Sequence, residues 1–348
     1  MEEIKVLHII TRLIVGGAQE NTMYTADKLD KTRYQVDVIS GPQTGSEGSL
    51  IDEFQTRQIK LKILPYLVRE INPIYDLIAI YKLYKIIKKN QYKIVHTHSS
   101  KAGIVGRIAA HLALSPVIIH TVHGWSFHNY MPRCIRLLYI LLERFTARFT
   151  DSVIVVSNND LDKGLANQIG DIRKYCLIRS AIPQNEYCEI YDKRNSIRNE
   201  LGIPSGAPVL GGIGRFTDQK NPLDWVRIAA LVKQAIPGCY FLLVGDGPLR
   251  DKVTALLHEL DLLQYTIMTG LRRDIPQLFS AMDIFLITSL WEGLPRVIPE
   301  AMLAGVPPVA SAVDGSMEII QNGVTGYICP PGKIQIFAAR CIKLLSNT

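Results

Sequence analysis

Short apolar runs rich in Val and Ile alternate with longer amphipathic stretches along the whole chain. Near-continuous apolar runs, separated by enough residues for a helix, are typical of a parallel sheet covered by helices on both faces. The pattern occurs twice, so we expect an α/β protein with two doubly wound, Rossmann-like domains. The predicted strands are 6–10, 36–40, 94–97, 117–121, 153–157, 209–213, 240–244, 266–269, 284–288 and 308–311.

A polar stretch separates the two sets of strands. Residues 181–207 contain the turn formers Pro183, Gly202 and Pro204, and the apolar strand pattern restarts at Val209. This predicts an N-terminal domain (1–180), a linker (181–207) and a C-terminal domain (208–348). Ligands of such sheets bind beyond the carboxyl ends of the strands, so we expect a site in a cleft between two facing domains.

The composition narrows the class of protein. With 348 residues and 47% hydrophobic positions, the chain can bury two cores. The longest apolar run, 137–142, is far shorter than the ~18 residues that would span a bilayer. The start is charged and has no apolar signal stretch, and the cysteines form no metal-binding pattern. We therefore expect a protein of the reducing cytoplasm.

The positive charge is concentrated in the first half. Residues 1–180 hold 24 Lys and Arg against 16 Asp and Glu, a net charge of +8, and the remainder has −1. This asymmetry indicates either an anionic partner or a solvated basic face. The stretch 131–149 predicts a basic amphipathic helix, which lies either on an anionic membrane or against the protein core. Its apolar positions are Leu138, Leu142, Phe145 and Phe149, and its cations are Arg133, Arg136, Arg144 and Arg148.

Two glycine-containing loops follow predicted strands. Gly16 and Gly17 let backbone N–H groups approach a ligand before a helix begins. The Gly212-Ile213-Gly214 sequence lacks the third glycine of a dinucleotide fingerprint, because Thr217 stands at that position. The sequence therefore does not favour an enzyme that binds a nicotinamide or flavin dinucleotide. Directly after it, Arg215 and Lys220 place two cations between a strand and a helix, where both suit phosphate oxygens.

Two carboxylates and a group of histidines are further candidates for ligand or metal binding. Glu292 is predicted in a strand-to-helix loop, where it could bind sugar hydroxyls, and Glu300 lies about two turns further on, where it could chelate a ribose diol. A salt bridge is the alternative for both. The histidines at 96, 98, 120 and 123 end predicted strands, but they lack a carboxylate third ligand, so we expect no metal. The 160–162 Asp-Leu-Asp sequence is interpreted as the first turn of a capped helix.

The ordered set of motifs resembles glycosyltransferase family 4, the retaining nucleotide-sugar transferases, and is closest to bacterial members that build capsule, exopolysaccharide and O-antigen. The resemblance covers nearly the whole chain and implies a two-domain glycosyltransferase-B (GT-B) architecture. The motifs are His-Thr-His-Ser-Ser-Lys-Ala-Gly (96–103), His-Thr-Val-His-Gly-Trp (120–125), Gly-Arg-Phe-x-x-x-Lys-Asn-Pro (214–222), Val-Gly-Asp-Gly-Pro-Leu (244–249), Ser-Leu-Trp-Glu-Gly-Leu-Pro (289–295) with Glu-Ala-Met (300–302), and Asn-Gly-x-x-Gly (322–326).

The resemblance also implies roles for individual residues. The cations at 215 and 220 would hold the donor diphosphate, and the carboxylate at 300 would bind the ribose hydroxyls. The residues at 292–295 would hold the donor sugar, and His123 would face it near the reacting carbon. Gly16 and Gly17 would close on donor phosphate or acceptor, with the acceptor side formed by His98, Ser99 and Lys101. The implied catalytic set is His123, Arg215, Lys220 and Glu292, and the donor set is Gly16, Gly17, Arg215, Lys220, Glu292, Gly293, Leu294, Pro295 and Glu300.

Together these features predict an enzyme that moves a sugar from a nucleoside-diphosphate sugar, with a uridine nucleotide favoured, to a saccharide or undecaprenyl-linked acceptor with retention of configuration. We expect no cofactor, no metal and no nucleic acid, and peripheral contact with the inner face of the membrane. Two departures from the family stand out: 179–183 replaces an Asn-Gly hinge motif, and the chain stops before the usual C-terminal crossover helix. A sugar-nucleotide 2-epimerase and a non-catalytic nucleotide-sugar-binding scaffold are the alternatives.

Overall fold

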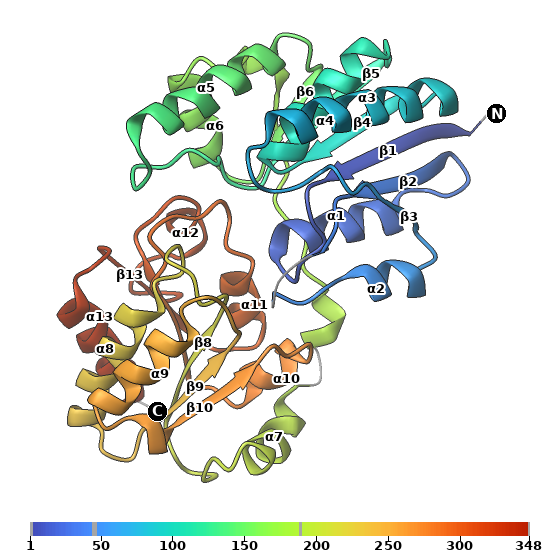
Figure 1. Ribbon diagram of the computed structural model, residues 1–348. Helices are drawn as coiled ribbons and strands as arrows, with labels where there is room; N and C mark the ends of the chain where they lie inside the picture. The colour runs from blue at the N-terminus through green and yellow to red at the C-terminus, as the bar shows by residue number, and fades with distance from the viewer. Residues whose placement is uncertain (1–2, 44–46, 188–189, 347–348) are drawn as a thin grey trace. The chain divides into compact units, whose positions relative to one another are not determined.

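The chain forms two compact units, Met1–Ala181 and Ile182–Thr348. The computed structural model describes residues 3–43, 47–187 and 190–346, and Figure 1 shows both units. Apart from Ala181, the described part of the stretch expected as a linker belongs to the second unit. There the Arg198 side chain is 1% exposed, and its Nη2 lies 2.9 Å from the Asp283 Oδ2 atom. Cys188 lies outside the described residues.

The N-terminal unit contains a seven-stranded sheet in the order β3-β2-β1-β4-β5-β6-β7, and every strand pair is parallel. The order reverses between the neighbouring strands β1 and β4, which is the switch point where doubly wound sheets bind ligands. The strands are β1 (Ile4–Ile10), β2 (Tyr34–Ser40), β3 (Lys60–Ile63), β4 (Ile94–His98), β5 (Val117–Val122), β6 (Ser152–Val155) and β7 (Tyr175–Leu177).

Helices connect these strands, and side-chain caps fix where two of them begin. The Asn72 side chain accepts a hydrogen bond from the Tyr75 N–H group at the start of α3, and Ser157 accepts one from the Asp160 N–H group at the start of α6. The second cap confirms the helix expected at 160–162. The helices are α1 (Gly17–Lys28), α2 (Ile51–Thr56), α3 (Pro73–Asn90), α4 (Ser100–Leu112), α5 (Arg133–Ala147), α6 (Asn158–Ala166) and the 3-10 helix η1 (Ile172–Lys174).

The C-terminal unit contains a six-stranded parallel sheet in the order β10-β9-β8-β11-β12-β13, with its switch point between β8 and β11. Its strands are β8 (Val209–Ile213), β9 (Tyr240–Val244), β10 (Thr266–Gly270), β11 (Ile284–Ile287), β12 (Pro308–Ser311) and β13 (Tyr327–Cys329). Its helices are α7 (Arg194–Glu200), α8 (Pro222–Ala235), α9 (Arg250–Glu259), α10 (Ile275–Ser280), α11 (Val297–Leu303), α12 (Ser316–Ile319), α13 (Ile334–Leu345) and the 3-10 helices η2 (Gln184–Tyr187), η3 (Tyr191–Lys193) and η4 (Leu263–Tyr265).

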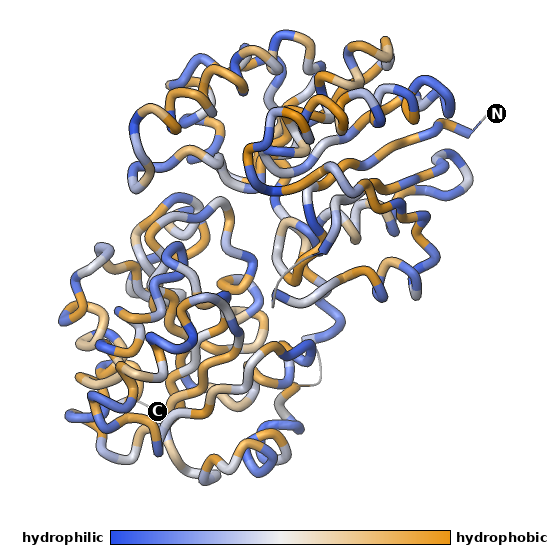
Figure 2. The backbone as a smooth tube through the Cα atoms, in the orientation of Figure 1, coloured by the Kyte–Doolittle hydropathy of each residue, from blue (hydrophilic) through white to orange (hydrophobic). Residues whose placement is uncertain are grey.

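The core of each unit lies on both faces of its sheet, and Figure 2 shows hydrophobic residues along the central strands and on the helices that cover them. Separate buried clusters cover the two faces of the C-terminal sheet, around Phe241 on one side and Phe285 on the other. The predicted α/β architecture is therefore confirmed, and so is each predicted strand to within about two residues. The strands β3, β7 and β13 were not predicted.

None of the helices in the described part of the chain is both long enough and apolar enough to cross a membrane.

Candidate functional site

The first candidate region lies where β8 and β11, neighbours at the switch point of the C-terminal sheet, end. The loop after β8 carries Arg215 and Lys220 and leads into α8. Both side chains line one depression, together with the Gly214 backbone and Thr288 at the end of β11. Lys220 also stands two residues before Pro222, the first residue of α8, where the helix dipole favours negative charge. The region combines two cations and a helix N-terminus, a combination that suits phosphate.

The loop after β9 packs against the loop after β8, which carries Arg215. Gly245 has φ of +134°, and a Cβ atom at this position would lie 2.0 Å from the Gly214 carbonyl oxygen. A side chain there would displace the loop that carries Arg215. The Phe216 N–H group donates to the Asp246 carbonyl over 2.9 Å. The 244–249 motif therefore acts by positioning the cationic loop, a role that its spacing alone did not indicate.

Glu292 meets Lys220 directly, although 72 residues separate them. Lys220 Nζ lies 2.5 Å from Glu292 Oε1, and their side chains are 21% and 7% exposed. The Glu292 N–H group donates to the Asp314 carboxylate over 2.7 Å, and the Gly315 N–H group donates to the Gly293 carbonyl over 3.0 Å. Asp314 and Gly315 thus hold the 292–295 loop. The Asp-Gly sequence by itself indicates only a turn.

Glu300 lies on α11, directly after this loop, and it is 7% exposed. Its Oε1 lies 3.3 Å from Nη2 of Arg296, a side chain that is 5% exposed. The oxygens of a carboxylate can accept hydrogen bonds from hydroxyl groups, and the neighbouring cation compensates its charge. Sequence reasoning missed Arg296, although its spacing of four residues from Glu300 on a helix is a usual ion-pair signal. Leu294 and Pro295 lie in the loop between β11 and α11.

The second region lies at the switch point of the N-terminal sheet, where β1 and β4 end. Gly16 immediately precedes α1, and Gly17 is its first residue. Thr11 after β1 and Ser99 after β4 lie 2.7 Å apart through their hydroxyl oxygens. Lys101 Nζ lies 2.5 Å from Asp76 Oδ1 on α3. Ser99 therefore forms a hydrogen bond with the loop after β1, whereas Lys101 forms an ion pair with α3.

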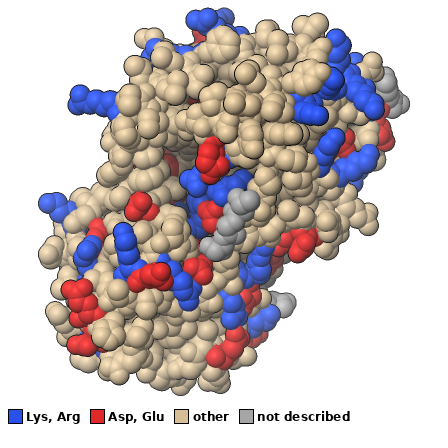
Figure 3. Space-filling view, viewed as in Figure 1, with Lys and Arg blue, Asp and Glu red and all other residues tan. Residues whose placement is uncertain are grey.

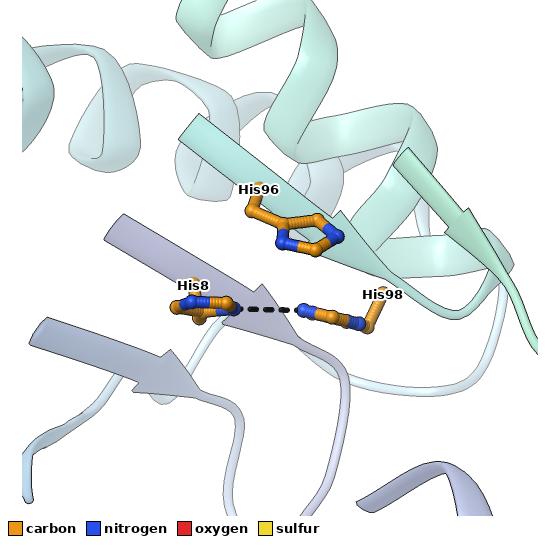
Figure 4. Close-up of side chains that lie close together, drawn as sticks. All are labelled: His8, His96 and His98. Atoms are coloured by element: carbon orange, nitrogen blue, oxygen red, sulfur yellow. Dashed lines mark hydrogen bonds between the residues drawn. The ribbon is translucent and has the colours of Figure 1, made fainter. Parts of the chain in front are cut away.

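A chain of histidines leads from the sheet to this region. His8 Nδ1 lies 2.9 Å from His98 Nε2, and His98 Nδ1 lies 3.2 Å from His123 Nε2. Figure 4 shows His8 on β1, with His96 and His98 on β4, gathered together. The parallel register pairs His8 with His96 and Ile10 with His98. Sequence reasoning missed His8, because only this register places it beside residues 90 positions away.

Burial favours the neutral form of these histidines. His8 and His98 are 0% and 1% exposed. Desolvation lowers the pKa of His8 to about 4. It also lowers the pKa of His96 and His98 well below the ordinary value, and the neighbouring imidazoles lower both further. His120 lies with Thr97, its partner in the β4–β5 register, and its Nδ1 lies 2.9 Å from the Thr97 hydroxyl oxygen.

The same cluster is the one group among the described residues whose donor atoms could hold a metal ion. One nitrogen from each of His8, His96 and His98 lies within 4.8 Å of the other two. Neutral imidazoles suit zinc. However, His8 and His98 already hydrogen-bond to one another, and His96 Nε2 lies 2.7 Å from the Thr121 hydroxyl oxygen. That no metal takes part stays a prediction.

Helix α5 presents apolar side chains to solvent. Leu137 and Leu141 are 55% and 50% exposed, and Leu138 and Phe145 are 44% and 49% exposed. Its buried side contains Ile140, together with Glu143 in a buried ion pair with Arg107. Leu142 and Phe149, expected on the same apolar face, are only partly exposed. The face shown in Figure 3 is largely uncharged over the N-terminal unit, whereas both charge signs intersperse over the C-terminal unit.

Family models match both halves of the chain. The model described as "Glycosyltransferase Family 4" matches residues 15–168, and the model described as "Glycosyl transferases group 1" matches residues 193–348. Each match falls within one of the two units. The order of the two matches agrees with the order of motifs in the sequence.

Individual proteins are similar over most or nearly all of the chain. The UDP-Gal:alpha-D-GlcNAc-diphosphoundecaprenol alpha-1,3-galactosyltransferase of Escherichia coli is 30% identical over 99% of this chain and 89% of that protein. The N-acetyl-alpha-D-glucosaminyl L-malate synthase of Bacillus anthracis is 28% identical over 79% of this chain and 71% of that protein. The crystal structure of Anabaena Alr3699/HepE in complex with UDP-glucose superposes with a TM-score of 0.82, at 22% identity, over 99% of this chain and 95% of that one.

Proposed function

The chain belongs to the glycosyltransferases of family 4 and group 1, with the GT-B fold, and we propose that it transfers a sugar from a UDP-sugar to a lipid-linked saccharide with retention of configuration. The reaction would serve the assembly of a bacterial surface polysaccharide. The E. coli relative, whose name gives UDP-Gal and a diphosphoundecaprenol-linked sugar, supports both substrate classes. The relatives favour a transferase over the epimerase and scaffold alternatives.

The observation that carries the proposal is the arrangement around Lys220. Arg215 and Lys220 line one depression at the end of β8, and Glu292 lies against Lys220. We assign the two cations to the donor diphosphate, because guanidinium and ammonium groups both suit phosphate oxygens. We assign Glu292 and the loop 293–295 to the hydroxyls of the transferred sugar. The buried Glu300 on α11 is assigned to the ribose diol.

The chemistry needs fixed positive charge more than a proton donor. Cleavage of the bond between the anomeric carbon and the diphosphate leaves negative charge on the departing oxygen. Cations aimed at that oxygen stabilise the transition state more than the ground state. In this proposal Arg215 and Lys220 supply that charge, and no metal takes part. The acceptor hydroxyl attacks from the face that the diphosphate leaves, and its proton passes to a diphosphate oxygen.

We further assign the exposed side of α5 to contact with an anionic membrane, where a lipid-linked acceptor resides. Its apolar side chains include Leu137 and Leu141, and cationic side chains at 133 and 136 lie in its first turn. Apolar side chains enter the headgroup region, and nearby cations are attracted to anionic lipid.

The test is a transfer assay with purified chain, a panel of UDP-sugars and a synthetic diphosphopolyprenol-linked GlcNAc acceptor. UDP release that depends on acceptor, with a product whose anomeric configuration by NMR equals that of the donor, is the expected result. An inverted product would overturn retention. Consumption of a UDP-sugar to an epimer without acceptor would overturn the transferase assignment.

A further inference from the structure

Three imidazoles form a continuous hydrogen-bonded chain in the N-terminal unit. It runs from His8 through His98 to His123, with nitrogen–nitrogen distances of 2.9 and 3.2 Å. Neighbouring rings in the chain are tilted by only 16° and 25°. The far end is the His8 Nε2 atom, which is buried and has no hydrogen-bond partner in the described part of the chain. His123 lies at the other end, directly after β5.

Neutral rings allow only a few arrangements of protons in this chain. Burial lowers the pKa of both His8 and His98 far below 7, so each ring holds one proton at neutral pH. A hydrogen bond between two imidazole nitrogens needs one proton between them. The proton position on one ring therefore fixes the position on the next.

Two arrangements satisfy both hydrogen bonds. In the first, His8 donates from Nδ1 to His98, and His98 donates from Nδ1 to His123 Nε2. A neutral His123 then carries its own proton on Nδ1. In the second, every bond is reversed: His123 donates from Nε2, His98 donates from Nε2, and the His8 proton lies on Nε2.

The buried end of the chain distinguishes the two arrangements. The first leaves an acceptor without a donor at His8 Nε2, and the second leaves a buried N–H group without an acceptor. Among buried backbone groups, orphaned N–H donors are rarer than under-satisfied carbonyl acceptors, and we extend this preference to the ring nitrogens of His8. We propose that His8 and His98 are positioning residues that hold His123 as its Nδ1-protonated tautomer, which donates a hydrogen bond to a carbohydrate oxygen.

This inference rests on the proposed function, because that function places His123 beside the transferred sugar. The inferred tautomer makes His123 a hydrogen-bond donor and not a general base. With Nδ1 protonated and Nε2 accepting from His98, His123 has no ring nitrogen left to take the acceptor hydroxyl proton. The acceptor hydroxyl proton therefore leaves with the diphosphate. The bond from the anomeric carbon to the diphosphate oxygen breaks, and the bond to the acceptor oxygen forms.

The direct test is two-bond ¹H–¹⁵N correlation NMR of the full chain labelled with ¹⁵N-histidine at neutral pH, which distinguishes protonated from bare ring nitrogens. Resonances are assigned with single His→Asn variants. We expect His8, His98 and His123 to be neutral and protonated at Nδ1. His98 protonated at Nε2, a cationic His98, or stoichiometric zinc bound to His8 and His98 would overturn the proposal. The experiment needs no substrate, so its outcome is independent of whether sugar transfer is observed.

A matched pair of variants links the tautomer to turnover. In H98N the side-chain amide can still donate from the position of Nδ1, whereas H98L has similar size and no donor. We expect H98L to give a mixture of His123 tautomers and about a tenfold lower kcat with a nearly unchanged donor KM. H98N is expected to restore the single tautomer and most of the lost kcat. An Nδ1-protonated His123 in H98L would show that His98 does not set the tautomer.

Discussion

Lys220 and Glu292 form a direct ion pair, with Nζ and Oε1 2.5 Å apart, that joins the loop after β8 to the loop after β11. Their backbones are joined as well, since the Leu290 N–H group donates to the Gln219 carbonyl over 2.8 Å. In this arrangement Glu292 compensates the charge of Lys220 before any anion arrives. If the diphosphate binds as proposed, it would share the ammonium with Glu292, and donor binding would then be coupled to the position of the 292–295 loop.

Lys220→Ala is expected to lower kcat/KM about 10- to 150-fold, the equivalent of a lost charge-assisted hydrogen bond of ~1.5–3 kcal/mol. The effect has two sources, because the diphosphate loses a cation and Glu292 loses its partner. Steady-state kinetics with the preferred UDP-sugar measure it. Lys252→Ala, at an exposed position on α9, is the control. Wild-type kinetics in Lys220→Ala, with the same melting temperature, would refute the assignment of the cation.

Glu300→Gln should weaken recognition of the nucleoside and not of the diphosphate. The assigned partner of this carboxylate is the ribose diol, so the wild-type chain is expected to bind UDP about tenfold more tightly than its 2′-deoxy analogue. In Glu300→Gln this preference should largely disappear, as measured by calorimetric titration. Glu259→Gln, at an exposed position on α9, should keep the preference. An undiminished preference in Glu300→Gln would place the ribose elsewhere.

Loss of one partner of the Arg107–Glu143 pair should destabilise the N-terminal unit. Both side chains are 1% exposed, and Nη2 lies 2.5 Å from Oε2. Glu143→Ala leaves a buried guanidinium without its carboxylate, which costs about 3–5 kcal/mol of unfolding free energy. Urea unfolding measures the loss. The double variant Arg107→Met/Glu143→Leu removes both charges and should recover most of it, whereas equal losses in the single and double variants would contradict this explanation.

The sequence was sufficient to predict the central strands but not the edge strands. Val209–Ile213 and Tyr240–Val244 were predicted with correct bounds, because both faces of these strands are covered and the apolar run is continuous. The Lys60–Ile63 edge strand alternates Lys with apolar residues and is largely exposed, so it lacks that signal.

Contacts between residues that are far apart in the sequence could not be predicted from local patterns either. Spacing identified Lys220 and Glu292 separately, but only the adjacency of β8 and β11 brings them together. In the same way, His8 gave no signal until the parallel β1–β4 register placed it beside His96. Local patterns predict which residues carry chemistry, whereas strand order determines which of them meet.

The buried histidines predict that stability falls in mild acid. In the unfolded chain a histidine binds its proton near pH 6.5, whereas burial lowers the folded pKa of His8 to about 4 and lowers that of His96, His98 and His120 as well. The unfolded state thus binds more protons below pH 6.5. The stabilisation is complete above that pH, and it is lost as pH falls toward 4.

We expect the unfolding free energy, measured by urea titration, to be nearly constant from pH 7 to 8. It should then decrease between pH 6.5 and 4, by up to about 1.4 kcal/mol per pH unit for each such histidine. His8→Phe should show a shallower decrease, and His258→Gln, at an exposed position, should keep the wild-type slope. A flat profile across this range would mean that these histidines keep their ordinary pKa in the folded chain.

The exposed side of α5 gives the last prediction, which concerns membrane contact. Leu137 and Leu141 are both at least half exposed, so replacing them with Asp should leave the fold intact, since neither side chain belongs to a buried cluster. The variant Leu137→Asp/Leu141→Asp loses apolar contact and adds negative charge, and both changes oppose binding to anionic lipid. Co-flotation with vesicles that contain phosphatidylglycerol should decrease at least tenfold, about 1.4 kcal/mol, while UDP release with a water-soluble acceptor stays unchanged.

Asp substitutions at two exposed positions of α9, Lys252 and Glu259, provide the control with unaltered apolar surface. Equal flotation of wild type and the α5 variant would place the membrane contact on another part of the chain.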